Sequence, residues 1–254
     1  MTQSREERKI LQGLSERASQ TLEILQAHEQ EKIDINPALA AALEGMSLTF
    51  VVFACLGTVR GKEELRLDLS ETIFFKKFRR QAERLLKSFS GEGIHTKLIV
   101  ILPDLEPRRT WGWQVPQEEI TGLCELMVED AASTLPQHWR VRLWSDIEME
   151  AQAGADYDTA LRWAMKSAPE LILRPETQFF RDFGRLHPDI IVADEPETRV
   201  ARKQIAAYAH EGRVLERLYP NAILLQTDTP VGRKDAMFNL LRREPLAIAH
   251  PFTR

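Results

Sequence analysis

Cysteine is scarce in this sequence, which contains Cys55 and Cys124 and no others. Two cysteines are too few for a disulfide framework. No CxxC pair or Cys–His spacing predicts a structural zinc site, and the six histidines are scattered without the spacing of metal ligands. The sequence therefore predicts no metal and no cofactor, and its cysteine usage indicates the reducing environment of the cytoplasm.

Long apolar runs are also missing. The N-terminal stretch MTQSREERKILQGLSERASQTLEILQ is charged and amphipathic and lacks the apolar centre of a signal peptide. No run approaches the ~18 apolar residues of a membrane span, so we expect no membrane partner. The net charge of −4 gives no global positive field, so any binding to nucleic acid would depend on a local basic patch.

What the sequence does have is a regular alternation of apolar runs and amphipathic segments. With 43% hydrophobic and 28% charged residues, the composition is that of an ordinary globular protein. Near-continuous apolar runs separated by helices are typical of a parallel sheet that is covered on both faces. We therefore predict an α/β fold, a Rossmann-like three-layer sandwich with a mainly parallel sheet. The predicted strands are LTFVVFACLG, KLIVILPD, WRVRLWSD, DIIVAD and, as the last of them, NAILLQTD. The predicted helices are IFFKKFRRQAERLLKSFSGEG, PQEEITGLCELMVEDAASTL and RVARKQIAAYAHEGRVLERLY.

The N-terminal part of the chain reads as a separate element. Apolar residues recur at helical spacing over residues 5–28, which predicts an amphipathic helix. We assign residues 1–46 to an N-terminal helical extension and residues 47–254 to the Rossmann-like α/β domain. The extension is expected to pack on the main domain or on a second copy of the chain, and the second arrangement would make a homodimer.

Ligands of such sheets bind beyond the carboxyl ends of the strands, so the turns that follow the strands are the places to examine. ACLGTVRG is neither a GxGxxG fingerprint nor a Walker loop, which argues against a nicotinamide or nucleoside triphosphate ligand. It is a tight turn that can present Thr58 or Cys55 as a nucleophile, or else a plain strand end with Cys55 buried. The turns after the other strands add the pocket candidates Asp104, Asp146 and Asp228.

Two helices carry further candidates. In the late helix, Tyr208 and Glu211 fall on an apolar stripe, where a phenol and a carboxylate can act as acid and base. The alternative is that Glu211 lies at the rim of the helix near Gly212. In the early helix, a basic stripe can bind a phosphodiester backbone, or it is a solvated face partly paired with Glu83. The residues of this stripe are Lys76, Lys77, Arg80, Arg84 and Lys87.

The small-residue turn ACLGTVRG, AAYAHEG on the late helix and the following YPNAILLQTDTP resemble the tRNA-dependent cyclodipeptide synthases. The resemblance implies that an aminoacyl group is transferred from aminoacyl-tRNA to a hydroxyl beyond the first strand. Thr58 stands where that family has a serine, and Tyr208 and Glu211 would orient and deprotonate the amine. Tyr219, followed by Pro220, is similar to a tyrosine–proline pair of one subfamily and joins the pocket candidates. The basic stripe would then contact the tRNA.

A second resemblance concerns LPDLE, WSDIE, RLYPNAILLQTD and the late AHPF, whose order is similar to that in the isonitrile synthases. These enzymes convert the amine of an amino acid to an isocyanide with a pentulose phosphate. Our main hypothesis from sequence is an aminoacyltransferase that forms a peptide bond, such as that of a cyclodipeptide, through an acyl-enzyme. The alternatives are an isonitrile synthase-like amino-acid-modifying enzyme and a non-catalytic module that binds a small molecule or mediates assembly.

Overall fold

A computed structural model describes seven stretches of the chain, residues 47–53, 73–91, 94–109, 116–136, 138–166, 197–225 and 247–249. The strands are β1 (Leu48–Phe53), β2 (Thr96–Leu102), β3 (Trp139–Leu143), β4 (Ile223–Leu225) and β5 (Ala247–Ala249). The helices are α3 (Ile73–Gly91), α4 (Glu106–Arg109), α5 (Gln117–Thr134), α6 (Trp144–Glu150), α7 (Gly154–Lys166) and α10 (Glu197–Leu218).

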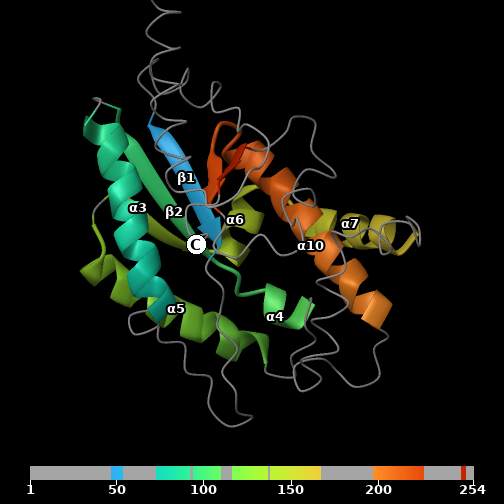
Figure 1. Ribbon diagram of the computed structural model, residues 1–254. Helices are drawn as coiled ribbons and strands as arrows, with labels where there is room; N and C mark the ends of the chain where they lie inside the picture. The colour runs from blue at the N-terminus through green and yellow to red at the C-terminus, as the bar shows by residue number, and fades with distance from the viewer. Residues whose placement is uncertain are drawn as a thin grey trace, which may run out of the picture.

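The strands form one parallel sheet with the order β3-β2-β1-β4-β5. The chain runs from β1 outward to β2 and β3, and the later strands β4 and β5 lie on the other side of β1 (Figure 1). The strand order therefore reverses between β1 and β4. In open sheets of this kind, the crevice at the carboxyl ends of the two strands at the reversal is where ligands bind.

Alternate residues of each strand face opposite sides of the sheet, and the strands are apolar at most positions, so both faces of the sheet are apolar. Phe50 and Val52 of β1 belong to the core cluster that includes residues of α3 and α5, whereas Val51 belongs to the cluster with residues of α6 and α10. Figure 1 shows α3 and α5 on one side of the strands and α6, α7 and α10 on the other. The predicted three-layer, Rossmann-like α/β fold is confirmed.

The direction of α10 determines which of its residues reach the ligand-binding edge. α10 ends at Leu218 and β4 begins at Ile223, so the chain reverses in a short turn and α10 runs antiparallel to the strands. The 22 residues of α10 span roughly 33 Å at 1.5 Å per residue, against roughly 20 Å for the six residues of β1. The N-terminal half of α10 therefore extends past the carboxyl ends of the strands (Figure 1).

The structure corrects two expectations from the sequence and adds one helix that was not expected. WRVRLWSD is not a strand throughout, because Trp144 begins α6 and only Trp139–Leu143 is extended. NAILLQTD does not contain the last strand, since β5 pairs with β4 beyond it. α7 was not expected, because its apolar face is made largely of alanines such as Ala160 and Ala164. The expected strand DIIVAD and the N-terminal extension lie outside the described residues.

None of the described helices combines the length and the apolar character needed to cross a membrane.

Candidate functional site

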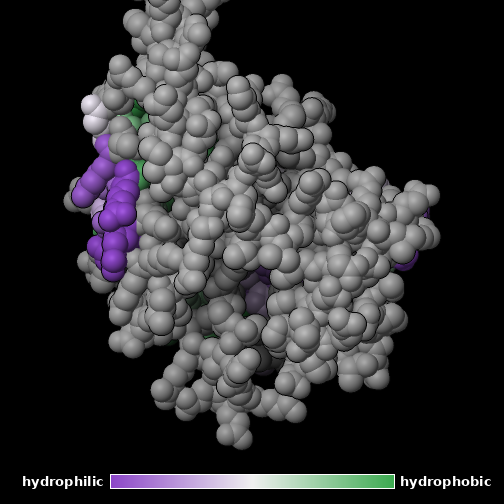
Figure 2. Space-filling view, viewed as in Figure 1, coloured by the Kyte–Doolittle hydropathy of each residue, from purple (hydrophilic) through white to green (hydrophobic). Residues whose placement is uncertain are grey.

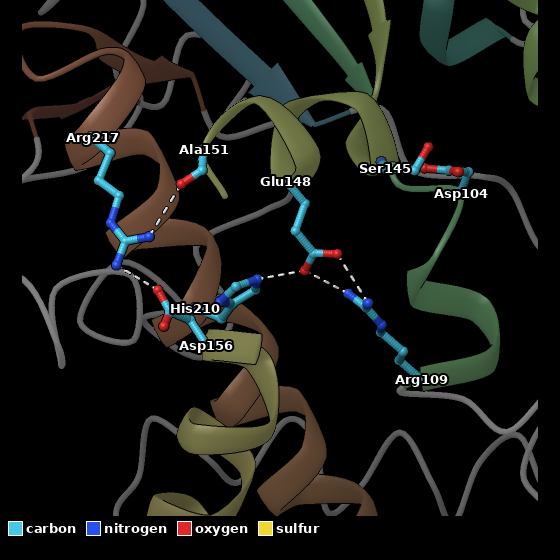
Figure 3. Close-up of polar contacts among 8 residues, drawn as sticks. All are labelled: Asp104, Arg109, Ser145, Glu148, Ala151, Asp156, His210 and Arg217. Carbon is cyan, nitrogen blue, oxygen red and sulfur yellow. Dashed lines mark hydrogen bonds and ion pairs between the residues drawn. The ribbon is translucent and has the colours of Figure 1, made fainter. Parts of the chain in front are cut away.

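A buried carboxylate lies at the carboxyl edge of the sheet, where α6 follows β3. Glu148 of α6 is 5% exposed. Its two oxygens accept hydrogen bonds from the guanidinium of Arg109, with Nη1–Oε1 2.7 Å and Nη2–Oε2 3.0 Å. Oε1 also lies 2.6 Å from Nε2 of His210. Figure 3 shows the carboxylate of Glu148 between the guanidinium of Arg109 and the imidazole of His210. We call these three residues the Glu148 cluster.

Three different elements supply the Glu148 cluster. Arg109 is the last residue of α4, which follows β2 after a short turn, and Glu148 lies one helical turn into α6. His210 comes from the middle of α10, which the chain reaches much later. The cluster therefore joins the carboxyl ends of two adjacent strands to the helix that covers them.

The neighbours of Glu148 keep it ionised. Burial alone would raise the pKa of this carboxyl group, but hydrogen bonds from His210 and Arg109 outweigh burial and leave the pKa below its ordinary value of 4.5. An ionised carboxylate can only accept hydrogen bonds. Nε2 of His210 must therefore carry a proton, and in the neutral imidazole Nδ1 is then the nitrogen with the lone pair.

The imidazole of His210 is held by aromatic side chains. Its ring meets Trp144 edge-on at a centroid distance of 5.9 Å and Tyr157 at 5.8 Å. The guanidinium of Arg109 lies 4.7 Å from the centre of the Tyr157 ring, and burial raises the pKa of this phenol to about 12. Nδ1 of His210 is shielded from solvent and has no hydrogen-bond partner among the described residues. Within the described residues, the carboxylate thus fixes one ring nitrogen and leaves the other unpaired, which is the arrangement of a general base with its orienting group.

A second contact of α10 holds the same elements together. Arg217 forms an ion pair with Asp156 of α7 and donates a hydrogen bond to the carbonyl oxygen of Ala151, at 3.3 Å (Figure 3). Because Ala151 immediately follows α6, this arginine connects α10 to both α6 and α7. It helps to fix the position from which His210 reaches Glu148.

Asp104, one of the predicted pocket residues, is fully buried, and its carboxylate is hydrogen-bonded within the protein. One carboxylate oxygen accepts a hydrogen bond from the backbone N–H of Ser145 at 3.0 Å (Figure 3), and the other accepts one from the hydroxyl of Thr121 at 3.3 Å. The backbone carbonyl oxygen of Asp104 accepts a hydrogen bond from the side-chain amide of Gln117. Asp104 therefore joins the end of β2 to the first turns of α5 and α6, and in this way it positions Glu148.

The other described pocket candidates lie apart from the Glu148 cluster. Asp146 is exposed in the first turn of α6. The hydroxyl of Tyr219 accepts a hydrogen bond from Arg142 of β3 at 2.9 Å, and Tyr219 packs in the core cluster between the sheet and α10. Asp228 lies outside the described residues, as do both proposed nucleophiles, Thr58 and Cys55.

Tyr208 and Glu211 face inward from α10. Glu211 is 4% exposed, so the stripe, and not the rim position, describes it correctly. Tyr208 is partly buried and packs against the cluster on the sheet and the cluster shared with α7. Their catalytic roles stay predictions, but both lie on the helix that carries His210.

The basic stripe on α3 is exposed where the structure describes it. Arg80, Arg84 and Lys87 are exposed, and Figure 2 shows hydrophilic side chains gathered along this helix. Arg79, beside the stripe, forms an ion pair with Glu83 at 3.0 Å. Lys76 and Lys77 belong to α3, but their side chains are not among those that the structure describes.

The residues of the Glu148 cluster are not among the candidates that the sequence suggests. From the sequence, WSDIE is expected at the end of a strand with Asp146 as the pocket candidate, but the segment is helical and buries Trp144, Ile147 and Glu148 on one face. That spacing was the available signal, because a carboxylate one turn from a buried tryptophan on the apolar face of a helix needs a partner. His210 is not a candidate by sequence, because the histidines lack the spacing of metal ligands. The described residues contain no group of three or more potential ligands placed to hold a metal ion.

No protein-family model matches this chain, and no curated protein matches it. Among solved structures, the chain is similar to the PvcA protein from Pseudomonas aeruginosa, with a TM-score of 0.51 and 18% identity. That alignment covers 87% of this chain and 81% of PvcA. Tyrosyl-tRNA synthetase from Leishmania major, solved with tyrosinol, aligns with a TM-score of 0.47 and 8% identity over 85% of this chain and 36% of the synthetase. The likeness to PvcA shows the same Rossmann-like α/β fold.

Proposed function

We propose that this protein is an enzyme that modifies the amino group of an amino acid, in the manner of the isonitrile synthases. The observation that carries the proposal is the Glu148 cluster, in which a buried, ionised carboxylate holds Nε2 of His210 at 2.6 Å and Nδ1 has no hydrogen-bond partner in the described part of the chain. His210 is the general base, Glu148 is its positioning residue, and Arg109 keeps Glu148 ionised.

The chemistry of an amine requires such a base. An amino acid carries its nitrogen as an ammonium group near neutral pH, and this group must lose a proton before it can attack a carbonyl carbon. Nδ1 of His210 takes that proton. The amine nitrogen then forms a bond to the carbonyl carbon of the pentulose phosphate, and the electron pair of the carbonyl double bond moves to its oxygen. The oxygen then receives the proton back from the imidazolium, and Glu148 stabilises the imidazolium in between. Since Nδ1 is shielded in this structure, substrate access requires a local opening.

Two of the stretches that resemble isonitrile synthases contribute to the site. WSDIE contains Trp144 and Glu148, and LPDLE contains Asp104, which positions the start of α6. The fold similarity to PvcA supports this alternative better than it supports transfer from aminoacyl-tRNA. The sequence resemblance and the cluster therefore support the same class of reaction.

The reaction can be tested with a labelled carbon source. The purified protein would be incubated with a mixture of the free amino acids and a uniformly ¹³C-labelled pentulose phosphate, and the small molecules would be analysed by mass spectrometry. We expect one amino acid to acquire one labelled carbon on its nitrogen with the loss of two hydrogens. An amino-acid pool that remains unlabelled and unchanged would contradict the proposal.

Transfer of an aminoacyl group from tRNA is the second candidate, supported by the burial of Glu211 beside Tyr208 and by the exposed cations of α3. Charge reversal at Arg80, Arg84 and Lys87 should abolish tRNA binding and flatten its salt dependence. Reversal of Arg162, an exposed cation of α7, serves as the control. Equal binding by both variants would remove the role of the basic stripe.

Intact mass separates the remaining possibilities. An aminoacyl adduct that forms with charged tRNA and disappears in Thr58→Ala or Cys55→Ala would establish the acyl-enzyme and its nucleophile. A protein that forms neither adduct nor labelled product, but is stabilised against heat by a metabolite, would be a non-catalytic binding module.

A further inference from the structure

Among the residues that the structure describes, Gln204 of α10 stands out as a buried carboxamide with both of its hydrogen-bonding atoms unpaired. Its side chain is 0% exposed, and neither Oε1 nor Nε2 has a hydrogen-bond partner among the described residues. Native proteins satisfy nearly all of their buried polar side-chain atoms, because a buried group without a partner loses its hydration and gains nothing in return. An apolar side chain of similar size would avoid this cost. The carboxamide therefore needs an explanation beyond packing.

The position of Gln204 on α10 places it near the candidate site. Gln204, Tyr208, Glu211 and Leu215 follow one another at the spacing of a single helical face, and Leu215 packs in the core cluster on the sheet. This face therefore looks toward the sheet. Gln204 lies at its N-terminal end, in the half of α10 that extends past the carboxyl ends of the strands.

The charges near this face connect it to the Glu148 cluster. The carboxylate of Glu211, two turns from Gln204, contributes to the raised pKa of Tyr157. Tyr157 in turn contacts both the guanidinium of Arg109 and the ring of His210. The buried glutamine and the buried glutamate are thus on one helical face at the same end of the molecule as the proposed base.

We propose that Gln204 is a ligand-binding residue that recognises the backbone groups of a free amino acid. A carboxamide has two N–H donors and one carbonyl acceptor, so it can donate to a carboxylate and accept from an ammonium group. Glu211 on the same face supplies a negative charge that favours an ammonium group. This assignment deepens the proposed function and rests on it for the class of substrate.

The test measures binding and does not depend on turnover. Each of the twenty standard amino acids would be titrated into the wild type by calorimetry, with thermal unfolding in parallel. For the amino acid that binds, Gln204→Leu should weaken the affinity by about 10- to 100-fold, because two hydrogen bonds to charged groups are lost. The unliganded variant should unfold at the same temperature as the wild type or higher, since it no longer buries an unpaired amide.

Gln117→Leu is the matched control. The amide nitrogen of Gln117 donates to the carbonyl oxygen of Asp104 at 2.9 Å and to Thr121 at 3.1 Å, so this carboxamide has a structural role. The control variant should unfold at a lower temperature and bind the amino acid as the wild type does. Equal affinity of Gln204→Leu and the wild type would overturn the role of Gln204.

Failure of the ligand class is a separate outcome. If the wild type binds none of the amino acids at millimolar concentration, the assignment of an amino acid to Gln204 is wrong. If binding depends on Gln204 but His210→Gln still forms labelled product, the proposed base is wrong and the binding residue stands. Failure of Gln204 as the binding residue and failure of His210 as the base therefore give different results.

Discussion

Replacing Glu148 by glutamine should destabilise the protein much more than the same replacement at Glu150 of the same helix. Glu148 accepts three contacts, two from Arg109 and one from His210. Glutamine can accept with its carbonyl oxygen, but its NH₂ group would face an N–H of Arg109 or of His210. At least one buried donor would then lose its partner.

The size of the effect follows from the burial of the three side chains. Removing one member of a fully buried ion pair costs about 3–5 kcal/mol. Here His210 is 1% exposed and Glu148 6%, but Arg109 is 28% exposed and can regain some hydration. We therefore expect a loss of about 2–4 kcal/mol. In a chain of 254 residues this corresponds to a Tm lower by roughly 4–16 °C.

Glu150→Gln is the control for this comparison. Glu150 forms an ion pair with Arg142 at 2.7 Å but is 53% exposed, so its loss should cost less than about 1 kcal/mol. The assay is urea unfolding followed by circular dichroism, with Tm from calorimetry. Equal losses in the two variants would show that the Glu148 cluster is not a coupled buried network.

Other parts of the structure give further expectations. The pKa of Glu148 is below its ordinary value of 4.5, so its stabilising contribution is complete above that value and is lost as the pH falls through the folded pKa. Urea unfolding between about pH 3 and pH 6 should therefore show a steeper loss of stability in the wild type than in Glu148→Gln. Burial, with the charges of Asp104 and Glu125, raises the pKa of the Cys124 thiol to about 12. In a Cys55→Ala background, a thiol reagent at pH near 8 should therefore react with Cys124 only after unfolding. Fast reaction of the native protein would contradict this. Asp104→Ala removes the acceptor of the Ser145 N–H in α6 and should lower the free energy of unfolding by about 2–3 kcal/mol. An unchanged urea midpoint would argue against the positioning role of Asp104.

The sheet and its main helices could be predicted from the sequence because their signals are local. LTFVVF and the LIVIL of the second strand are near-continuous apolar runs, which are typical of parallel strands covered on both faces. The apolar face and charged face of α3 likewise define a helix at once. α7 and β5 were harder, because an alanine-based face and a three-residue strand depend on contacts with α10 and β4 for their stability.

The Glu148 cluster is of another kind, since its three residues come from distant parts of the chain. Glu148 is 39 positions from Arg109 and 62 from His210, and no local period connects them. What the sequence does contain is the stripe on α10, which predicts the burial of Glu211 correctly. The neighbouring His210 points toward α6 and α7, and this became visible only when those helices were in place.

The most direct test of the proposed base is a comparison of product formation by His210→Gln and His138→Gln. Glutamine at position 210 can still donate a hydrogen bond to Glu148 but has no basic nitrogen, whereas His138 is exposed and lies away from the cluster. With the labelled pentulose phosphate and the responsive amino acid, we predict that His210→Gln loses about 10²- to 10⁴-fold in rate while His138→Gln matches the wild type. A folded His210→Gln protein that forms product at the wild-type rate would contradict the assignment of His210 as the base.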